Sequence, residues 1–447
     1  MKKGMFFALA ASSLLFSACS SDNAVVSTEG QNEAVQQIVL QVASSGDGLT
    51  TRAGRPLYSS EALQTIQNVR VVIYNADTKE IVKDATQDWT KSTTYNNHGH
   101  GRQFTLTFKG NDRLEKGNYK VMAVGYSNES DYEYSLNATS AVGLTYNDIT
   151  ATLKAGKKEA EEVFAGDADL KIGDDKKITN LTSGEENGVA VTLHRQVAGS
   201  FGYFQNIPAS VNGKAAATLR LVVRDKNDVL TFNNFNSSFT ANGATGSTIK
   251  YYVNGSKSTS AATADAKFNN NEDGYVLYSI NLSKWFTEGD KNKDGLLNAE
   301  DTWQHSSSVN TQVVKGSVFG SNFVIPFNYA KGKSTMELQL LDAENNIIKT
   351  WTVSIPKDDV NTDTANGVTD ASTSIFNVVR NHMYNLGVKT SNGTKPDPSN
   401  PDPKPTDPDP DKPKPGTDEP EDLSKSQNLI LKVNDNWEAI HKMELGD

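Results

Sequence analysis

Short runs in which apolar and polar residues alternate recur along most of the chain. A period of two is typical of half-buried β-strands. The predicted strands cover residues 38–42, 69–74, 104–108, 120–126, 189–193, 219–223 and 336–341. Gly, Asn and Asp turns separate these runs, and long amphipathic helical patterns are scarce. The pattern predicts an all-β protein built from β-sandwiches, and a length of 447 residues predicts two of them.

The same alternation returns near the end of the chain, behind an unusual tether. The residues Leu429, Leu431 and Val433 alternate with Ile430, Lys432 and Asn434, and this period of two predicts a half-buried strand. The preceding residues 391–422 are rich in Pro-Asp and Pro-Lys, which favour extended polyproline II. Residues 396–420 could reach roughly 75 Å, far more than a turn within one domain needs. We interpret the tail as a strand made for another molecule. The alternatives are that it folds back into its own domain, or that its last residues, with Trp437, form a helical turn.

The N-terminus has the pattern of a targeting segment. Lys2 and Lys3 precede the apolar run 5–15, which is too short to span a bilayer as a helix. Phe16-Ser17-Ala18-Cys19 follows and looks like a bacterial lipoprotein signal, with the lipid carried on Cys19. The alternative is a secretory signal with a chance cysteine. Cys19 is the only cysteine, so disulfides and metal–thiolate clusters are excluded.

A protease-sensitive bond is predicted between Arg52 and Ala53. A turn-rich stretch, 44–48, precedes this bond, and an arginine followed by small residues in an exposed segment is cut well by trypsin-like proteases. An ordinary loop arginine is the alternative.

Charge and motifs exclude several functions. The net charge of -10 argues against nucleic-acid binding, which needs a basic surface. We find no nucleophile elbow, Walker loop, Rossmann fingerprint or zinc-protease motif, and we expect no enzymatic activity.

Residues 290–301 fit the pattern of a calcium loop. Oxygen-bearing side chains fall at loop positions 1, 3, 5, 9 and 12, a main-chain carbonyl falls at position 7, and glycine stands at position 6. The predicted ligands are Asp290, Asn292, Asp294, Leu296, Asn298 and Asp301. Position 12 is aspartate where an EF-hand has glutamate. A plain acidic turn is the alternative, and an ion here is expected to be structural.

Several short motifs together resemble the fimbrillins of Bacteroidales, the type V pilus subunits. They are the lipoprotein-like Cys19, the strand ahead of Thr51-Arg52-Ala53, Val163-Phe164-Ala165-Gly166, Leu193-His194-Arg195-Gln196-Val197-Ala198, Phe323-Val324-Ile325-Pro326-Phe327 and Val379-Arg380-Asn381-His382-Met383-Tyr384. The Pro-Asp linker and the alternating strand behind it resemble the tail of a major subunit. The resemblance runs over nearly the whole chain.

The resemblance implies a route of assembly and a fold. Such subunits are exported as outer-membrane lipoproteins, and an arginine-specific protease then cuts the chain, here between Arg52 and Ala53. The cut releases the strand that contains Ile38, Leu40 and Val42. The tail of another subunit, with Leu429, Leu431, Val433 and Trp437, fills the groove. Family members fold as two tandem transthyretin-like β-sandwich domains.

The expected organisation follows from these points. It comprises a signal peptide (1–18), a propeptide with the removable strand (19–52), N-terminal (53–184) and C-terminal (185–390) sandwiches, a linker (391–422) and a donor-strand segment (423–447). We expect a fimbrial shaft subunit at the cell surface, serving adhesion, with other fimbrial subunits as partners and no required cofactor beyond a structural calcium. The alternatives are a tip subunit, or a monomeric lipoprotein that binds glycans or matrix through exposed Trp89, Trp285 or Trp303.

Overall fold

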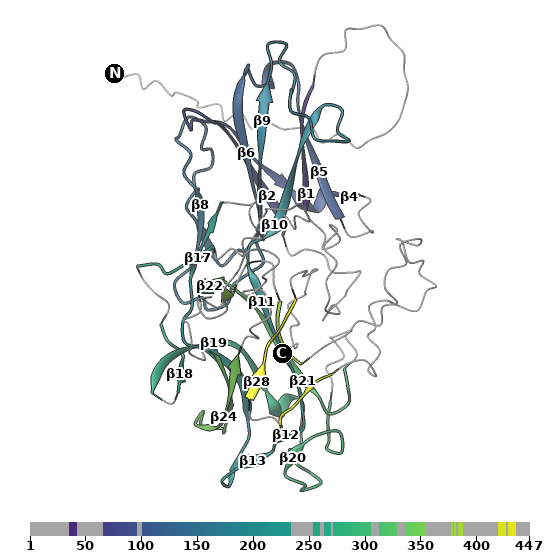
Figure 1. The fold of residues 1–447 in the computed structure, drawn as a ribbon, viewed down its shortest axis with the longest axis vertical. Helices are drawn as coiled ribbons and strands as arrows, with labels where there is room; N and C mark the ends of the chain where they lie inside the picture. The colour runs from purple at the N-terminus through teal and green to yellow at the C-terminus, as the bar shows by residue number, and fades with distance from the viewer. Residues whose placement is uncertain are drawn as a thin grey trace, which may run out of the picture.

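The computed structural model describes residues 35–42, 66–95, 101–233, 254–259, 263–269, 271–304, 313–328, 336–354, 377–378, 380, 383–387, 419–425 and 428–434. Within these ranges the regular elements are β-strands and short 3-10 turns, as the alternation predicts. Figure 1 shows two β-rich regions along the long axis, with β1, β2, β5, β6, β9 and β10 in the upper one. We call these regions the N-terminal and the C-terminal sandwich.

The N-terminal sandwich is one eight-stranded sheet that curls on itself. In spatial order its strands are β3 (Ile81–Asp88), β2 (Asn68–Asn75), β6 (Gly117–Tyr126), β9 (Phe164–Ile172), β10 (Gly188–Arg195), β1 (Gln36–Val42), β5 (Gly101–Phe108) and β4 (Thr93–Tyr95). Strand β10 joins the two halves, because only its end, His194 and Arg195, pairs with β9. Alternate residues of both halves, such as Val71, Val121 and Val191, meet in one hydrophobic core.

The C-terminal sandwich consists of a six-stranded and a five-stranded sheet. The six-stranded sheet has the order β18 (Ala266–Phe268), β19 (Glu272–Asn281), β15 (Thr218–Val223), β23 (Met336–Leu341), β24 (Ile347–Ser354) and β28 (Asn428–Ile430). The five-stranded sheet has the order β21 (Val318–Val324), β11 (Ala198–Gln205), β26 (Met383–Leu386) and β29 (Lys432–Asn434), and β27 (Glu421–Asp422) also pairs with β11.

The two sandwiches are interlocked, which corrects the predicted boundary between residues 184 and 185. Strand β10 lies beyond that boundary and yet belongs to the N-terminal sheet. A four-stranded sheet also combines strands from both halves of the chain, β17 (Gly255–Ser256), β16 (Val229–Phe232), β8 (Ile149–Leu153) and β7 (Tyr132–Tyr134). The prediction was wrong because it followed order along the chain, whereas strand pairing joins segments that are far apart in sequence.

Short ladders and turns complete the described part. They are β12 (Ile207–Pro208), β13 (Ser210–Val211), β14 (Lys214–Ala215), β20 (Leu296–Leu297), β22 (Phe327–Asn328), β25 (Asn377–Val378), η1 (Trp89–Lys91), η2 (Gly110–Asp112) and η4 (Leu282–Lys284).

A buried ion pair lies at the junction between β10 of the N-terminal sheet and β11 of the C-terminal sandwich. Arg195, the last residue of β10, donates from Nε and Nη2 to Oε1 of Glu162, at 2.9 and 2.6 Å. Both side chains are almost fully buried, and the Arg195 guanidinium lies over the ring of Phe164. Nearby, Gly166 is required because a Cβ would lie 1.9 Å from the carbonyl oxygen of Thr192.

Candidate functional site

Strand β1 lies inside the N-terminal sheet and has a partner on each side. It pairs in parallel with β10 over Gln37 to Val42 and antiparallel with β5 over Gln36 to Val42. Figure 1 shows β1 beside β5 and β10. Removal of β1 would therefore leave an open groove between β10 and β5, with unpaired main-chain groups on both walls.

The side chains of β1 supply part of the sandwich core. Ile38 is 1% and Leu40 is 0% exposed, and both pack into the N-terminal hydrophobic cluster. Val39, on the opposite face, is also buried. Burial of three such aliphatic side chains is worth roughly 5 to 9 kcal/mol, comparable with the stability of about 5 to 15 kcal/mol of a whole domain. Val42 lies in β1 as predicted, but its side chain lies outside the described part.

A buried glutamine fixes the first residue of β1, and sequence analysis missed it. Gln36 is 1% exposed, and its amide makes three hydrogen bonds to the main chain. Nε2 donates to the carbonyls of Leu114 (3.0 Å) and Lys176 (2.8 Å), and Oε1 accepts from the Leu114 N–H at 2.8 Å. We call these two carbonyls and this N–H the Gln36 socket. A glutamine at the start of an alternating run looks like an ordinary exposed strand end, so only the tertiary contacts identify it.

The predicted lipidation and cleavage sites, Cys19, Arg52 and Ala53, lie outside the described residues. The chain does place the Arg52–Ala53 bond between two described strands, since β1 ends at Val42 and β2 begins at Asn68. A cut there would separate β1 covalently from everything that follows.

The described tail lies on the edges of its own C-terminal sandwich. Strand β28 pairs in parallel with β24, where Val353 opposes Leu429, and β29 pairs antiparallel with β26, where Tyr384 opposes Val433. Leu429 and Leu431 are both 0% exposed. The side chain of Val433, and Trp437 as a whole, lie outside the described part.

This placement agrees with the alternative that the tail folds back into its own domain. Donation of the tail to another subunit stays a prediction, because a long tether allows the tail to reach either site. The edges of β24 and β26 would otherwise present unpaired main-chain groups, and β28 and β29 cover them. The tail is thus held by pairing on one side of each short strand.

Asp422 fastens the start of the tail. Its carboxylate accepts hydrogen bonds from Asn206 Nδ2 (3.0 Å) and from the N–H (3.1 Å) and hydroxyl (2.6 Å) of Ser424, and it forms an ion pair with Lys425 at 2.8 Å. Burial alone would raise the pKa of Asp422, but the hydrogen bonds from Lys425, Ser424 and Asn206 outweigh it and lower the pKa to about 2. Leu423 beside it is fully buried.

The predicted calcium loop closes on itself around its acidic side chains. Asp290 accepts from the N–H groups of Asp294 and Gly295, and Asp301 accepts from those of Lys291 and Asn298. Gly295 has φ +89°, so position 6 needs glycine. The next residues, β20, pair with β12, which ties the loop to the C-terminal sandwich.

The donor chemistry of this loop suits a calcium ion if two amides turn. The side-chain amides of Asn292 and Asn298 donate to Asp294 Oδ2, at 3.1 and 2.7 Å. Rotation of each amide by half a turn would present oxygens instead. No group of three His, Cys, Asp or Glu side chains with metal-binding geometry occurs among the described residues. A site here would therefore depend on the asparagine oxygens and on the Leu296 carbonyl as well. Calcium binding stays a prediction.

The tryptophans proposed as exposed binding residues are not exposed. Trp89 is 3% and Trp285 is 1% exposed, and both belong to hydrophobic clusters. Trp303 is half-buried, and its Nε1 donates to the Ser317 carbonyl at 2.8 Å. The prediction was wrong because local sequence does not show which tryptophans pack into a core, and Trp89 and Trp285 each belong to a hydrophobic cluster.

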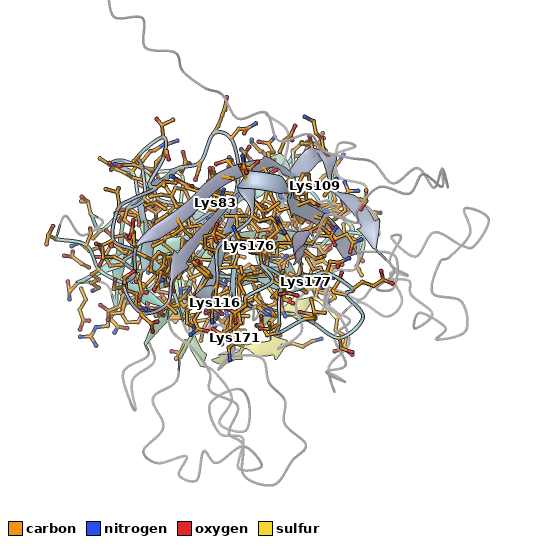
Figure 2. The ribbon with its side chains drawn as sticks, turned by 90° about the horizontal axis from the view of Figure 1, so that it is seen from above. Lys83, Lys109, Lys116, Lys171, Lys176 and Lys177 are labelled. Atoms are coloured by element: carbon orange, nitrogen blue, oxygen red, sulfur yellow. The ribbon has the colours of Figure 1, made fainter. Side chains whose placement is uncertain are left out.

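Lysines gather at the end of the N-terminal sandwich where β1 begins. Figure 2 shows Lys83, Lys109, Lys116, Lys171, Lys176 and Lys177 in a view onto this end. Several have carboxylate partners, including Lys116 with Asp174 at 2.7 Å and Lys176 with Glu115. The surface is therefore one of mixed charge. Among the described residues, no helix is long and apolar enough to cross a bilayer.

Comparisons with known proteins give remote structural similarity. No family model and no curated protein sequence matches the chain. The fimbrial anchor protein Mfa2 from Porphyromonas gingivalis is 8% identical, with 91% of this chain and 99% of that chain covered and a TM-score of 0.35. The C-terminally truncated tip fimbrial protein Mfa3 from the same organism is 8% identical, with 79% and 94% covered and a TM-score of 0.35. A fimbrial assembly protein from Parabacteroides distasonis is 15% identical, with 80% and 92% covered and a TM-score of 0.31. These are Bacteroidales fimbrial proteins, the class that the sequence motifs resemble.

Proposed function

We propose that this chain is a structural subunit of a bacterial surface fimbria that polymerises by strand exchange and serves adhesion. The precursor is exported as a lipoprotein with its lipid on Cys19 and is cut after Arg52. The observation that carries the proposal is the position of β1, which is paired on both sides within the sheet and lies ahead of the cut. Once cut, β1 is held only by non-covalent contacts.

The pairing of the two strands supports the direction of exchange. In the groove, a strand of seven residues such as β1 pairs along both edges. On its own sandwich, the tail pairs through two strands of three residues, each along one edge. A tail that leaves its own edges for an emptied groove therefore gains main-chain hydrogen bonds. Leu429 and Leu431 are already 0% exposed on their own sandwich, so the gain in buried apolar area lies with the emptied groove of the receiving subunit. Such a contact is head-to-tail and does not close on itself, so it grows a fibre.

The presence of both a removable strand and a tail favours a shaft subunit over a tip, since a tip needs only the first. The alternative of a monomer that binds glycans or matrix relied on exposed tryptophans, and Trp89 and Trp285 are buried.

Limited digestion of the full chain with an arginine-specific protease tests the proposal. We expect cleavage after Arg52, followed by ladders of polymer on denaturing gels run without boiling. Arg52→Gln and a chain that ends after residue 422 serve as matched controls, and each should stay monomeric under the same conditions. A cleaved wild-type protein that remains monomeric at high concentration would contradict the proposal.

A further inference from the structure

The groove between β10 and β5 binds the side chain of Gln36 at one end. The tail has a glutamine at the corresponding position of its sequence. Residues 36–42 read Gln-Gln-Ile-Val-Leu-Gln-Val, and residues 427–433 read Gln-Asn-Leu-Ile-Leu-Lys-Val. The apolar positions coincide, and the first residue is glutamine in both. We propose that Gln427 of one subunit enters the Gln36 socket of the next, so that the tail takes both the polarity and the register of β1. The inference rests on the proposed strand exchange and deepens it.

The socket is selective because two of its three polar groups, the N–H and the carbonyl of Leu114, are buried, and the third, the Lys176 carbonyl, is partly buried. Gln36 is 1% and Leu114 is 4% exposed. Without a suitable side chain, the Leu114 N–H and the carbonyls of Leu114 and Lys176 would lose the three bonds that Gln36 makes. The free-energy penalty of a buried polar group without a hydrogen bond is considerably larger than the net stabilisation from one hydrogen bond. The occupant must both donate and accept, and a primary amide does this.

The socket decides the polarity of the incoming strand. The central triplet Leu429-Ile430-Leu431 is a palindrome in apolar character, so it fits the core positions of β1 in either direction. The ends of the segment are different. With reversed polarity, Val433 would occupy the Gln36 position and offer nothing to the socket. Gln427 therefore favours the polarity of β1, parallel to β10.

The socket also decides the register. A slip of one residue turns the apolar side chains to the wrong face of the sheet. A slip of two residues keeps the faces but brings Leu429 or Lys425 to the Gln36 position. Leucine can neither donate nor accept there, and lysine cannot accept from the Leu114 N–H. Only the register with Gln427 in the socket satisfies both the core and the polar end.

Disulfide mapping tests the register directly. The single native cysteine, Cys19, lies ahead of the cut and is absent from the processed subunit. In β1, Gln41 opposes Gln103 of β5, so residue 432 of the incoming tail should oppose Gln103. Directly opposed residues have Cα atoms about 4.5 to 5.5 Å apart, which a disulfide can bridge, and a shift of two residues adds a step of about 7 Å along the strand.

Three double variants of the full chain are compared after cleavage and mild oxidation. Each carries Gln103→Cys together with Ile430→Cys, Lys432→Cys or Asn434→Cys. We expect covalent ladders on non-reducing gels from the Lys432→Cys pair alone. Ladders from the Ile430→Cys or Asn434→Cys pair in place of it would overturn the proposed register while leaving strand exchange intact. Absence of polymer from all three and from the wild type would overturn the exchange itself, and the register with it.

A second set of variants tests Gln427. Gln427→Leu keeps the size of the side chain but cannot hydrogen-bond, and we expect polymer growth to slow about tenfold or more. In the cysteine background it should also spread the cross-links to residues 430 and 434. Asn428→Ala, which changes the counterpart of the half-exposed Gln37, should leave rate and register unchanged. Gln427→Leu with the growth rate and the single cross-link of the wild type would show that Gln427 does not occupy the socket.

Discussion

Gln36 and Leu114 are 78 residues apart in the chain and exchange two hydrogen bonds, from Nε2 to the Leu114 carbonyl at 3.0 Å and from the Leu114 N–H to Oε1 at 2.8 Å. This contact fixes one end of β1, and the burial of Ile38 and Leu40 fixes its middle. The strand is thus an integral part of the N-terminal sandwich. Any replacement must satisfy both its polar end and its apolar core.

Truncation of a core side chain of β1 should destabilise the uncut precursor. Leu40→Ala removes a side chain that is 0% exposed, so we expect a loss of about 2 to 5 kcal/mol in the free energy of unfolding of the N-terminal sandwich. Urea denaturation followed by tryptophan fluorescence measures it. Gln41→Ala, a half-exposed neighbour, should change the value by less than about 0.5 kcal/mol. Equal stability of the two variants would mean that β1 does not contribute to the core.

Removal of one partner of the buried ion pair should be more damaging than removal of an exposed one. Glu162→Ala leaves the Arg195 charge buried beside Phe164, and we expect a loss of about 3 to 5 kcal/mol. Asp174→Ala removes the exposed partner of Lys116 and should cost less than about 1 kcal/mol. Chemical denaturation of both variants checks this, and a loss below about 1 kcal/mol for Glu162→Ala would count against the buried pair.

Asp422→Asn should loosen the tail from its own sandwich. The variant loses the ion pair with Lys425 and weakens the bonds from Asn206 and Ser424. We expect faster amide hydrogen exchange in β27 to β29 and, after cleavage at Arg52, faster polymer growth. Asp342→Asn is the matched control, because the pKa of Asp342 is also lowered to about 2, by hydrogen bonds from Asn346 and Lys214, at a turn of β23 and β24. Exchange in the tail that is the same for both variants would contradict the role of Asp422.

The same carboxylate predicts the direction of a pH effect on tail docking. The pKa of Asp422 is about 2 in the docked tail, against an ordinary value of 3.8. The ionised group therefore stabilises docking above about pH 4, and this contribution is lost as the pH falls towards 2. Hydrogen-exchange protection in β27 to β29, corrected for the intrinsic exchange rate at each pH, should fall over this window more in the wild type than in Asp422→Asn. An equal loss of protection in both proteins would show that other groups cause it.

Calcium should raise the melting temperature of the chain if residues 290–301 bind it. At a 100-fold excess over Kd the expected rise is about 5 to 10 °C, and a chelator should reverse it. Differential scanning calorimetry measures both. Asp294→Ala should abolish the rise, whereas Asp273→Ala, which removes an exposed carboxylate paired with Lys267, should keep it. The same melting temperature with calcium and with chelator would indicate that residues 290–301 form a plain acidic turn without a bound ion.

Period-two patterning predicts much of this fold because alternation follows from one buried face. The runs at 69–74 and 104–108 fall within β2 and β5, and the run at 38–42 falls within β1. The all-β class follows from the same signal. Patterning contains no information on partners, so the parallel pairing of β1 with β10 and the shared sheet of β8 and β16 could not be predicted.

The sequence predicted the apolar residues of the candidate site but not its buried polar residue, Gln36. Ile38 and Leu40 were identified as core residues by their spacing, and both are buried. Gln36 was not identified, because a buried glutamine differs from an exposed one only through partners that are distant in sequence, here Leu114 and Lys176. The return of the tail to its own sandwich depends on its pairing with β24 and β26, which lie far from it in the sequence and which local patterning does not specify.

The most direct test of strand exchange is the intact mass of every chain in purified polymer formed after cleavage at Arg52. We expect one species that begins at Ala53, with the peptide that contains β1 absent from the washed fibre. Recovery of that peptide in a one-to-one ratio with the subunit would contradict strand exchange, because the groove would then still hold its original strand.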